Sequence, residues 1–311
     1  MENRIKNIAV VGIGGVGGYF GGLLANSVKD QQVTFIARGE HAEKIKSNGL
    51  VLEISDRRVT CIPQMLTDKI SEIVNPDLVI LCTKSYDLED VVSQLDAVIQ
   101  ENTILLPLLN GVDICDRIRK VTKKGIILPS CVYIAAHISS PGVISISGPQ
   151  GAIISGSDKG NKDFNPDLLI KLFENTGFKF KWVEEPYQAI WEKYAYVASF
   201  AVVTAYSGKN FVDVVNDANL LELLKGVMNE ILSLAKATNI NMPEGFFERS
   251  VKRTSLLSPE ARTSFSRDIE KGKKSEIDVF GYTIINMGKE YGVETPVTMR
   301  LVEEIEMKVK C

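Results

Sequence analysis

The chain has 311 residues, of which 45% are hydrophobic and 24% are charged, and its formal net charge is −3 at pH 7. This length and composition are typical of a globular protein of one large or two ordinary domains, and they exclude disorder over most of the chain. The weak negative charge offers no general attraction for nucleic acid or an anionic membrane, so a metabolite-sized partner is expected.

Neither a secretory leader nor a membrane helix is expected. The N-terminal sequence MENRIKNIAVVGIGG passes from charged residues directly into a short apolar run. The longest uncharged stretch, Tyr194 to Gly208, is shorter than the roughly 20 apolar residues that a membrane helix needs. Five scattered cysteines form no C-x-x-C pair, and neither histidine has a second plausible ligand nearby, so no disulfide framework and no metal site are indicated. The cytoplasm is the expected compartment.

The first part of the chain alternates β-branched runs with helical patterns. Strands are expected at Asn7–Val11, Val33–Ala37, Leu78–Cys82, Thr103–Pro107, Gly125–Ser130, Val132–His137, Gly142–Ser147, Ala152–Ser155 and Phe178–Val183. Helices are expected at Val16–Ser27, Leu88–Gln100 and Asp167–Asn175. Strands that alternate with helices predict βαβ units and an α/β fold with a parallel, doubly wound sheet.

After about Glu184 the pattern changes from mixed to helical. Helices are expected at Tyr187–Tyr206, Asn219–Thr238, Phe246–Leu257 and Glu276–Tyr291, with Pro186 well placed in the first turn of the first of them. We therefore expect two domains: residues 1–183 with a Rossmann-type sheet, and residues 184–311 with helices only.

A glycine-rich turn follows the first expected strand and opens the first helix. Its residues are Gly12, Ile13, Gly14, Gly15, Val16 and Gly17, in the pattern G-x-G-x-x-G. The first glycine permits the tight turn, the second permits backbone to approach a pyrophosphate, and the third permits close packing of helix on strand. The helix N-terminus supplies N–H groups and a positive dipole for phosphates. A dinucleotide site is predicted, and a purely structural glycine turn is the alternative.

Arg38 follows the second expected strand, where a site that prefers NAD would place an acidic residue to accept from the ribose 2′-hydroxyl. A guanidinium can instead pair bidentately with a 2′-phosphate. NADP(H) is therefore the predicted cofactor. The alternative is a solvated charge at the end of a strand.

Lys193 lies in a segment whose next charged residue is Lys209. Its ammonium either reaches the surface or enters an apolar cleft, where it could stabilise the charge that develops on a ketone oxygen and donate the proton. The residues alone leave both readings open.

Four further residues are candidates with simple structural alternatives. Glu276 could be a carboxylate favoured by a helix N-terminus, Ser264 a surface serine, and Asn110 part of an ordinary Asn-Gly turn. Lys84 follows an expected strand at the carboxyl edge of the parallel sheet, where ligands of such folds bind.

Taken together and in order, these residues resemble the ketopantoate reductase (2-dehydropantoate 2-reductase) family along nearly the whole chain. The matching segments are VVGIGGVGGYFG, Cys82-Thr-Lys84-Ser, Leu109-Asn110-Gly111, Trp191-Glu-Lys193, Thr263-Ser264-Phe265, Lys274-Ser-Glu276-Ile-Asp278 and Tyr291-Gly-Val-Glu-Thr-Pro296-Val.

The resemblance implies a Rossmann domain and a helical C-terminal domain of the 6-phosphogluconate dehydrogenase type, with the active site in the cleft between them. It implies that Lys193 donates the proton to the ketone, that Glu276 is its acidic partner, and that Ser264 contacts the substrate. Lys84 and Asn110 match positions that face the nicotinamide and the substrate, and Arg38 matches the residue that accepts the 2′-phosphate. The implied reaction is the NADPH-dependent reduction of 2-dehydropantoate, a small 2-oxo acid, to (R)-pantoate, a precursor of pantothenate and coenzyme A.

One departure concerns the substrate. Well-known members of the family carry asparagines four and eight residues after the catalytic lysine, where this chain has Val197 and Ala201. Each lost amide removes hydrogen bonds worth roughly 1 kcal/mol or more. Asn210 could partly replace them in binding substrate.

Three alternatives stay open, and so does a homodimer, since the sequence does not decide the oligomeric state. The first is a paralogue that reduces another branched 2-oxo acid with the same lysine and glutamate. The second is a non-catalytic NADP(H)-sensing protein, which could lose Lys193 and Glu276 without penalty. The third is a flavin enzyme, against which Arg38 argues because it replaces an acidic residue.

Overall fold

The structure is a computed structural model that describes residues 4–255, 257 and 261–310. The chain divides into two compact units, Met1–Leu109 with Asp113–Pro186, and Asn110–Val112 with Tyr187–Cys311. The short segment Asn110–Val112 therefore belongs by its contacts to the C-terminal unit, although it follows a strand of the N-terminal one.

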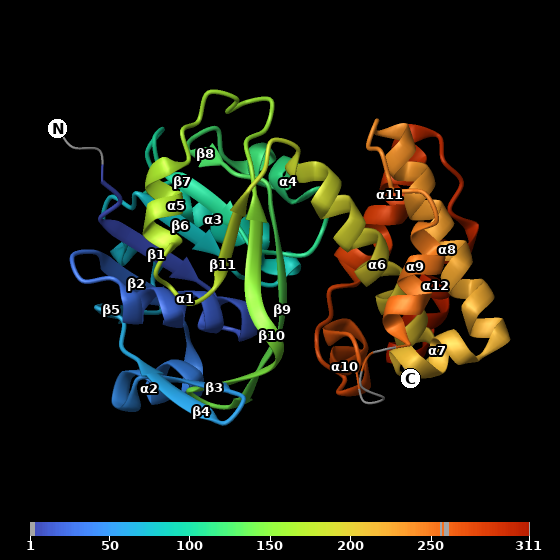
Figure 1. Cartoon of the computed structure of the whole chain (residues 1–311), viewed down its shortest axis with the longest axis horizontal. Coiled ribbons are helices and arrows are strands. Elements are labelled where there is room, and N and C mark those ends of the chain that lie inside the picture. Colours follow the sequence, from blue (N-terminus) through green and yellow to red (C-terminus); the bar gives the residue numbers. More distant parts are fainter. Residues whose placement is uncertain (1–3, 256, 258–260, 311) are drawn as a thin grey trace. The chain divides into compact units, whose positions relative to one another are not determined.

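A six-stranded sheet forms the centre of the N-terminal unit, and each neighbouring pair in it is parallel. Its order is β5-β2-β1-β6-β7-β8 (Figure 1). Successive strands are therefore added on one side of β1 up to β5 and on its other side from β6 onward. The strands are β1 (Asn7–Val11), β2 (Gln32–Ile36), β5 (Met65–Thr67), β6 (Leu78–Leu81), β7 (Ile104–Pro107) and β8 (Ile126–Ile127). The side chains of β6 and β7 are buried throughout, as expected for a parallel sheet covered on both faces. The predicted parallel sheet is confirmed.

A second, five-stranded sheet lies in the same unit and was not expected. Its strands are β3 (Leu50–Ile54), β4 (Arg57–Cys61), β9 (Ser130–Ser140), β10 (Val143–Ser155) and β11 (Lys179–Trp182). The two short runs expected at Gly142–Ser147 and Ala152–Ser155 are one strand, β10, with a register irregularity between them. Neither β3 nor β4 was expected, because their hairpin carries charged side chains and β3 gains its pairing from the distant strand β10.

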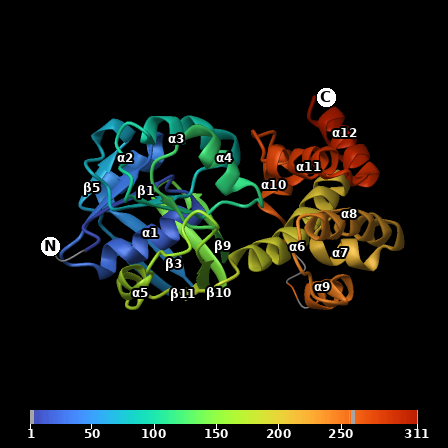
Figure 2. The same cartoon turned by 90° about the horizontal axis from the view of Figure 1, so that it is seen from above.

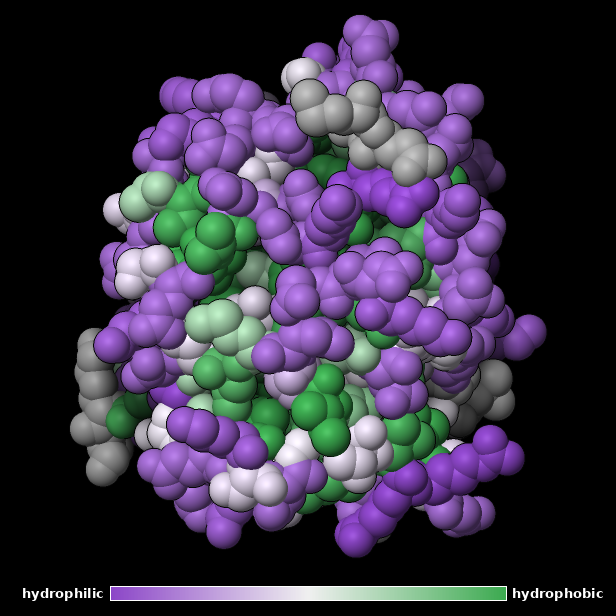
Figure 3. Space-filling model, turned by 90° about the vertical axis from the view of Figure 1, so that its left-hand side faces the viewer, coloured by the Kyte–Doolittle hydropathy of each residue, from purple (hydrophilic) through white to green (hydrophobic). Residues whose placement is uncertain are grey.

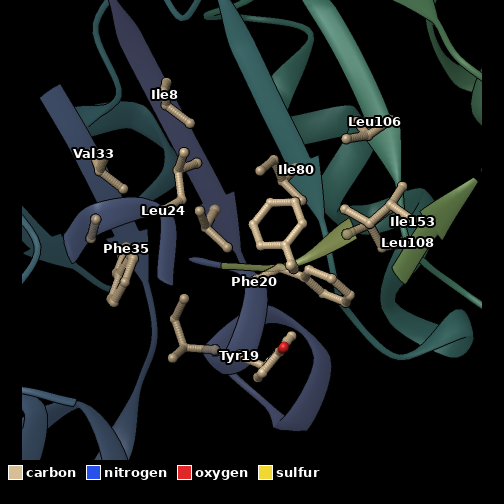
Figure 4. Close-up of a cluster of buried hydrophobic side chains, with 14 of the residues drawn as sticks. Ile8, Tyr19, Phe20, Leu24, Val33, Phe35, Ile80, Leu106, Leu108 and Ile153 are labelled. Atoms are coloured by element: carbon tan, nitrogen blue, oxygen red, sulfur yellow. The ribbon is translucent and has the colours of Figure 1, made fainter. Parts of the chain in front are cut away.

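Helix α1 (Gly15–Ser27) packs between the two sheets and contacts strands of both. Figure 4 shows its Phe20 and Leu24 among side chains of the parallel sheet, including Ile8 and Ile80. The Phe20 ring also meets Phe178 edge to face, with ring centroids 5.0 Å apart. Figure 2 shows α3 (Leu88–Leu95) and α4 (Ile114–Val121) on the other side of β1 from α1. The glycine turn is therefore anchored by a helix that is buried between two layers.

Two further helices complete this unit, α2 (Gly39–Asn48) and α5 (Asp167–Phe173). Neither α2 nor α4 was expected from the sequence, because both are short and highly polar. On the face drawn in Figure 3, hydrophilic side chains predominate and hydrophobic ones gather in small patches between them. Such small patches are ordinary for a folded surface.

The C-terminal unit contains helices and no strand among its described residues. They are α6 (Pro186–Ser207), α7 (Phe211–Asn216), α8 (Ala218–Ala237), α9 (Phe246–Thr254), α10 (Ser264–Glu270), the π-helical turn η3 (Asp278–Tyr282), α11 (Thr283–Tyr291) and α12 (Pro296–Lys310). The predicted helical C-terminal part is confirmed, and α6 begins at Pro186 as expected. Helices α7, α10 and α12 were not expected, and Leu256, near the end of one predicted helix, lies outside the described residues.

The segment around Glu276 differs slightly from its prediction. Helical structure begins at Ile277 rather than at Glu276, whose carbonyl accepts a hydrogen bond from the Phe280 N–H. The continuous helix expected there is divided into η3 and α11. None of the helices in the part of the chain that the structure describes is both long and apolar enough to cross a membrane.

Candidate functional site

The glycine turn has the local geometry that its sequence pattern predicts. Gly12 adopts φ of 93°, and a Cβ atom there would lie 2.8 Å from the Cys82 carbonyl oxygen. A Cβ atom at Gly17 would lie 2.0 Å from the Gly12 carbonyl oxygen. At Gly14, by contrast, no atom of a described residue other than its neighbours in the chain lies within 4 Å of the position of a Cβ. Two glycines thus permit close packing, while the third leaves space over the backbone.

The first turn of α1 offers hydrogen-bond donors to a ligand in that space. Gly14 occupies the N-cap position and has no side chain that could accept from the first N–H groups of the helix. No acidic residue lies in the first turn. The first N–H groups of an α-helix have no partner within the helix, and the helix dipole favours an anion beside them. These features fit the pyrophosphate of a dinucleotide.

Strand β9 closes one side of the turn, and this contact was not expected from the sequence. A Cβ atom at Gly15 would lie 2.3 Å from the Ala136 carbonyl oxygen of this strand. The local signal was only a run of small residues in an expected strand, Ala135 and Ala136. The approach of the two segments is decided by the second sheet.

Arg38 lies just after β2 and occupies the N-cap position of α2. Its side chain is 80% exposed, and its Nη2 lies 3.8 Å from the carboxylate of Asp87. An exposed ion pair at this distance contributes little to stability, so its guanidinium can exchange this partner for a more highly charged anion.

Lys84 follows the carboxyl end of β6 and precedes the 3₁₀ turn η2 (Ser85–Asp87). It is half-buried. The turn after it is tied to α4, because Arg117 Nη2 donates to the Ser85 carbonyl oxygen at 2.6 Å. The same guanidinium forms two hydrogen bonds with Glu89 of α3, at 2.6 and 2.9 Å.

We expect the pair of Arg117 and Glu89 to make stability depend on pH. The hydrogen bond from Arg117 lowers the pKa of Glu89 below its usual value. A lowered folded-state pKa stabilises the protein above the unfolded value of about 4.3, and this contribution disappears as the pH falls through the folded-state pKa. Because the Glu89 side chain is 47% exposed, solvent screening limits the effect to about 1 kcal/mol.

The measurement compares urea unfolding of wild type and Glu89→Gln between pH 7 and pH 3. Wild type should be the more stable protein at pH 7, and the difference should shrink at low pH. Exposed Glu101 provides the matched control, Glu101→Gln, which should show no such change. A difference for Glu89→Gln that is independent of pH would contradict the interpretation.

Lys193 and Asn110 come together in the C-terminal unit. Lys193 lies on α6, and its Nζ donates a 2.8 Å hydrogen bond to Asn110 Oδ1. Asn110 comes shortly after β7 and precedes Gly111, whose φ is 126°. The Lys193 side chain is half-buried, and its ammonium is bonded to an amide from a segment 83 positions away in sequence.

Glu276 and Ser264 lie on two other segments of this unit. Glu276 is 5% exposed, so it is not an ordinary surface carboxylate at a helix start. Ser264 is the half-buried first residue of α10. The preceding Thr263 caps α10, and its hydroxyl forms a 3.1 Å hydrogen bond with that of Thr204 on α6. This bond ties the start of α10 to the helix that carries Lys193.

Asn210 has a structural role in this fold. Its side-chain oxygen caps α7 by accepting from the Asp213 N–H at 2.8 Å, and its amide nitrogen donates to the Asp213 carboxylate at 2.6 Å. A contact with substrate would require Asn210 to share these groups. On α6, Val197 is half-buried and Ala201 is fully buried. Among the described residues, no group of three or more His, Cys, Asp or Glu side chains is arranged to hold a metal ion.

The fold and the glycine turn define the class of this protein: a Rossmann-type protein with an all-helical C-terminal unit. Residues 8–160 match the family model described as ketopantoate reductase PanE/ApbA, and residues 187–309 match the model of its C-terminal part. The chain therefore belongs to the ketopantoate reductase PanE/ApbA family of oxidoreductases.

Individual relatives are distant but match over almost their whole length. The chain is 25% identical to the uncharacterized oxidoreductase YkpB of Bacillus subtilis (strain 168), covering 96% of this chain and 97% of the relative. It is 28% identical to a 2-dehydropantoate 2-reductase of Pyrococcus abyssi, covering 94% and 95%. The crystal structure of 2-dehydropantoate 2-reductase from Porphyromonas gingivalis W83 is similar with a TM-score of 0.81 and 27% identity, covering 97% of this chain and 99% of that one.

Proposed function

We propose that this protein catalyses the NADPH-dependent reduction of the C2 ketone of 2-dehydropantoate to (R)-pantoate, a step toward pantothenate and coenzyme A. The observation that carries the proposal is the hydrogen bond between Lys193 and Asn110, which holds an ammonium in place on the helical unit. Family membership and the 2-dehydropantoate 2-reductases among the relatives support the same reaction.

The proposed cofactor site lies on the N-terminal unit. Gly14 leaves space for the pyrophosphate, the first turn of α1 donates N–H groups to it, and Arg38 pairs with the 2′-phosphate. Lys84, at the carboxyl edge of the sheet, lies where ligands of such folds bind. When bound, NADPH supplies the hydride.

In the proposed mechanism, Lys193 acts on the ketone oxygen. Since the Asn110 side-chain oxygen is a hydrogen-bond acceptor, it orients the lysine ammonium as a donor. Negative charge grows on the ketone oxygen as the carbon is reduced, and the ammonium stabilises this charge and donates the proton. Glu276 would serve as the acidic partner of Lys193 and Ser264 as a substrate contact.

We predict that Arg38→Gln weakens NADPH binding about tenfold or more and leaves NADH binding nearly unchanged. A charge-assisted hydrogen bond to phosphate is worth about 1.5–3 kcal/mol, and NADH has no 2′-phosphate to lose. Fluorescence titration at one fixed ionic strength measures both dissociation constants. Arg58→Gln, at another exposed arginine of the same unit, is the control. Equal losses for both dinucleotides would argue against contact with the 2′-phosphate.

A second candidate is the reduction of another branched 2-oxo acid. It is favoured by the α6 helix itself, where Val197 and Ala201 follow Lys193 at successive turns and offer no side-chain hydrogen bond. A substrate without a hydroxyl group would lose fewer hydrogen bonds to water on binding beside these side chains than 2-dehydropantoate would. The same lysine would serve the reaction.

The test follows the loss of NADPH absorbance with 2-dehydropantoate and with a panel of other 2-oxo acids. The highest kcat/KM should be obtained with 2-dehydropantoate. If another 2-oxo acid is preferred, the second candidate replaces the first. If the protein binds NADPH but reduces none of the acids, both proposals fail and a sensing role is favoured.

A further inference from the structure

His41 joins two elements that flank the proposed cofactor site. It lies in the first turn of α2, and its Nδ1 accepts a 2.9 Å hydrogen bond from the backbone N–H of Gly142. Gly142 is buried in the turn between β9 and β10 and adopts φ of 81°. The two residues are 101 positions apart in sequence, so this bond fixes the start of α2 to a remote hairpin.

The His41 ring also interacts with the backbone of the glycine turn, at Ile13. Nε2 is buried and has no hydrogen-bond partner among the described residues. Because Nδ1 accepts a bond, the neutral ring carries its proton on Nε2. Burial lowers the pKa of His41, and the Ile13 interaction opposes this shift only in part. The neutral ring that the Gly142 bond requires is therefore the favoured form at neutral pH.

The first turn of α2 also carries Arg38, at its N-cap. The guanidinium is 80% exposed, and its 3.8 Å approach to Asp87 is too weak to define where the side chain lies. The backbone from which Arg38 extends therefore fixes the region that its guanidinium can reach. That backbone is anchored by His41, three residues further along the helix.

We propose that His41 is a positioning residue for the dinucleotide site, which holds the first turn of α2, and with it Arg38, against the glycine turn. This inference rests on the proposed binding of NADPH to the N-terminal unit. The sequence alone does not connect His41 with the cofactor, because both Gly142 and Ile13 are far from His41 along the chain.

Two substitutions of His41 separate the effect of its hydrogen bond on cofactor binding from the effect of the volume of its ring. His41→Asn places a side-chain oxygen about where Nδ1 lies, so it keeps an acceptor for the Gly142 N–H. His41→Leu keeps apolar bulk and removes the acceptor. Fluorescence titration should show His41→Leu binding NADPH about tenfold more weakly than wild type, with a smaller loss for NADH, while His41→Asn should keep most of the affinity and of the preference for NADPH.

Ser47→Leu is the control, since Ser47 is an exposed residue of the same helix. Thermal unfolding of each variant shows whether it is folded at the titration temperature. The proposal is overturned if His41→Leu binds NADPH as tightly as wild type, if His41→Asn binds as weakly as His41→Leu, or if NADPH and NADH lose affinity equally. If wild type binds neither dinucleotide, both the proposed function and the role of His41 fail. If wild type binds NADPH tightly and the His41 variants bind it equally well, only the role of His41 fails.

Discussion

Replacing Lys193 by alanine should lower kcat for the reduction of the 2-oxo acid by on the order of 10² or more. The ammonium bonded to Asn110 is the proposed donor of the proton, and alanine can neither donate it nor stabilise charge on the ketone oxygen. The dissociation constant of NADPH should change little, because the glycine turn and Arg38 lie on the other unit. Steady-state rates from NADPH absorbance and a binding titration measure the two effects separately.

Lys209→Ala is the matched control for this substitution. Lys209 is an exposed lysine just beyond the end of α6, so its loss removes the same charge without touching Asn110. It should leave kcat and KM close to those of wild type. Wild-type turnover by Lys193→Ala would rule out the assigned role, and loss of NADPH binding in that variant would show a different role for the lysine.

Glu230→Leu should destabilise the helical unit by about 3 kcal/mol, because it leaves several buried donors without their charged acceptor. Glu230 lies on α8 and is 8% exposed, and its carboxylate accepts from the N–H groups of Val297 and Thr298 at 2.7 and 3.0 Å. It also accepts from the Thr298 hydroxyl at 2.6 Å. These residues begin α12, so the carboxylate caps that helix from a neighbouring one. Leucine would leave three donors without an acceptor, and each such loss in a buried place is costly.

Urea unfolding measures the loss, and hydrogen exchange of the α12 amides locates it. Glu222→Leu is the control, because Glu222 is exposed on the same helix. Glu230→Gln keeps one side-chain oxygen and should fall between wild type and Glu230→Leu. A Glu230→Leu protein as stable as the Glu222→Leu protein would show that solvent replaces the carboxylate, and that the cap contributes little.

Features encoded within a few tens of residues could be predicted from the sequence. The strand, the glycine turn and the helix around Gly12 and Gly17 form one contiguous unit, whose requirement for small residues is local. The parallel sheet follows from alternating runs, and the helical C-terminal part follows from long periodic segments such as α6 and α8. Pro186 marked the start of α6 because a proline at the first turn loses no hydrogen bond.

Only the tertiary structure decided the pairings between distant segments. The second sheet joins β3 to β10, and Lys193 meets Asn110 across 83 residues, His41 meets Gly142 across 101, and Glu230 meets Val297 across 67. No local pattern specifies such a contact, because its free energy is gained only when separate elements pack and bury the groups that must pair. The sequence by itself determined the strands of the parallel sheet around the glycine turn, the long helices and the kinds of residue that could act, while packing decided which of them meet and formed the short polar elements.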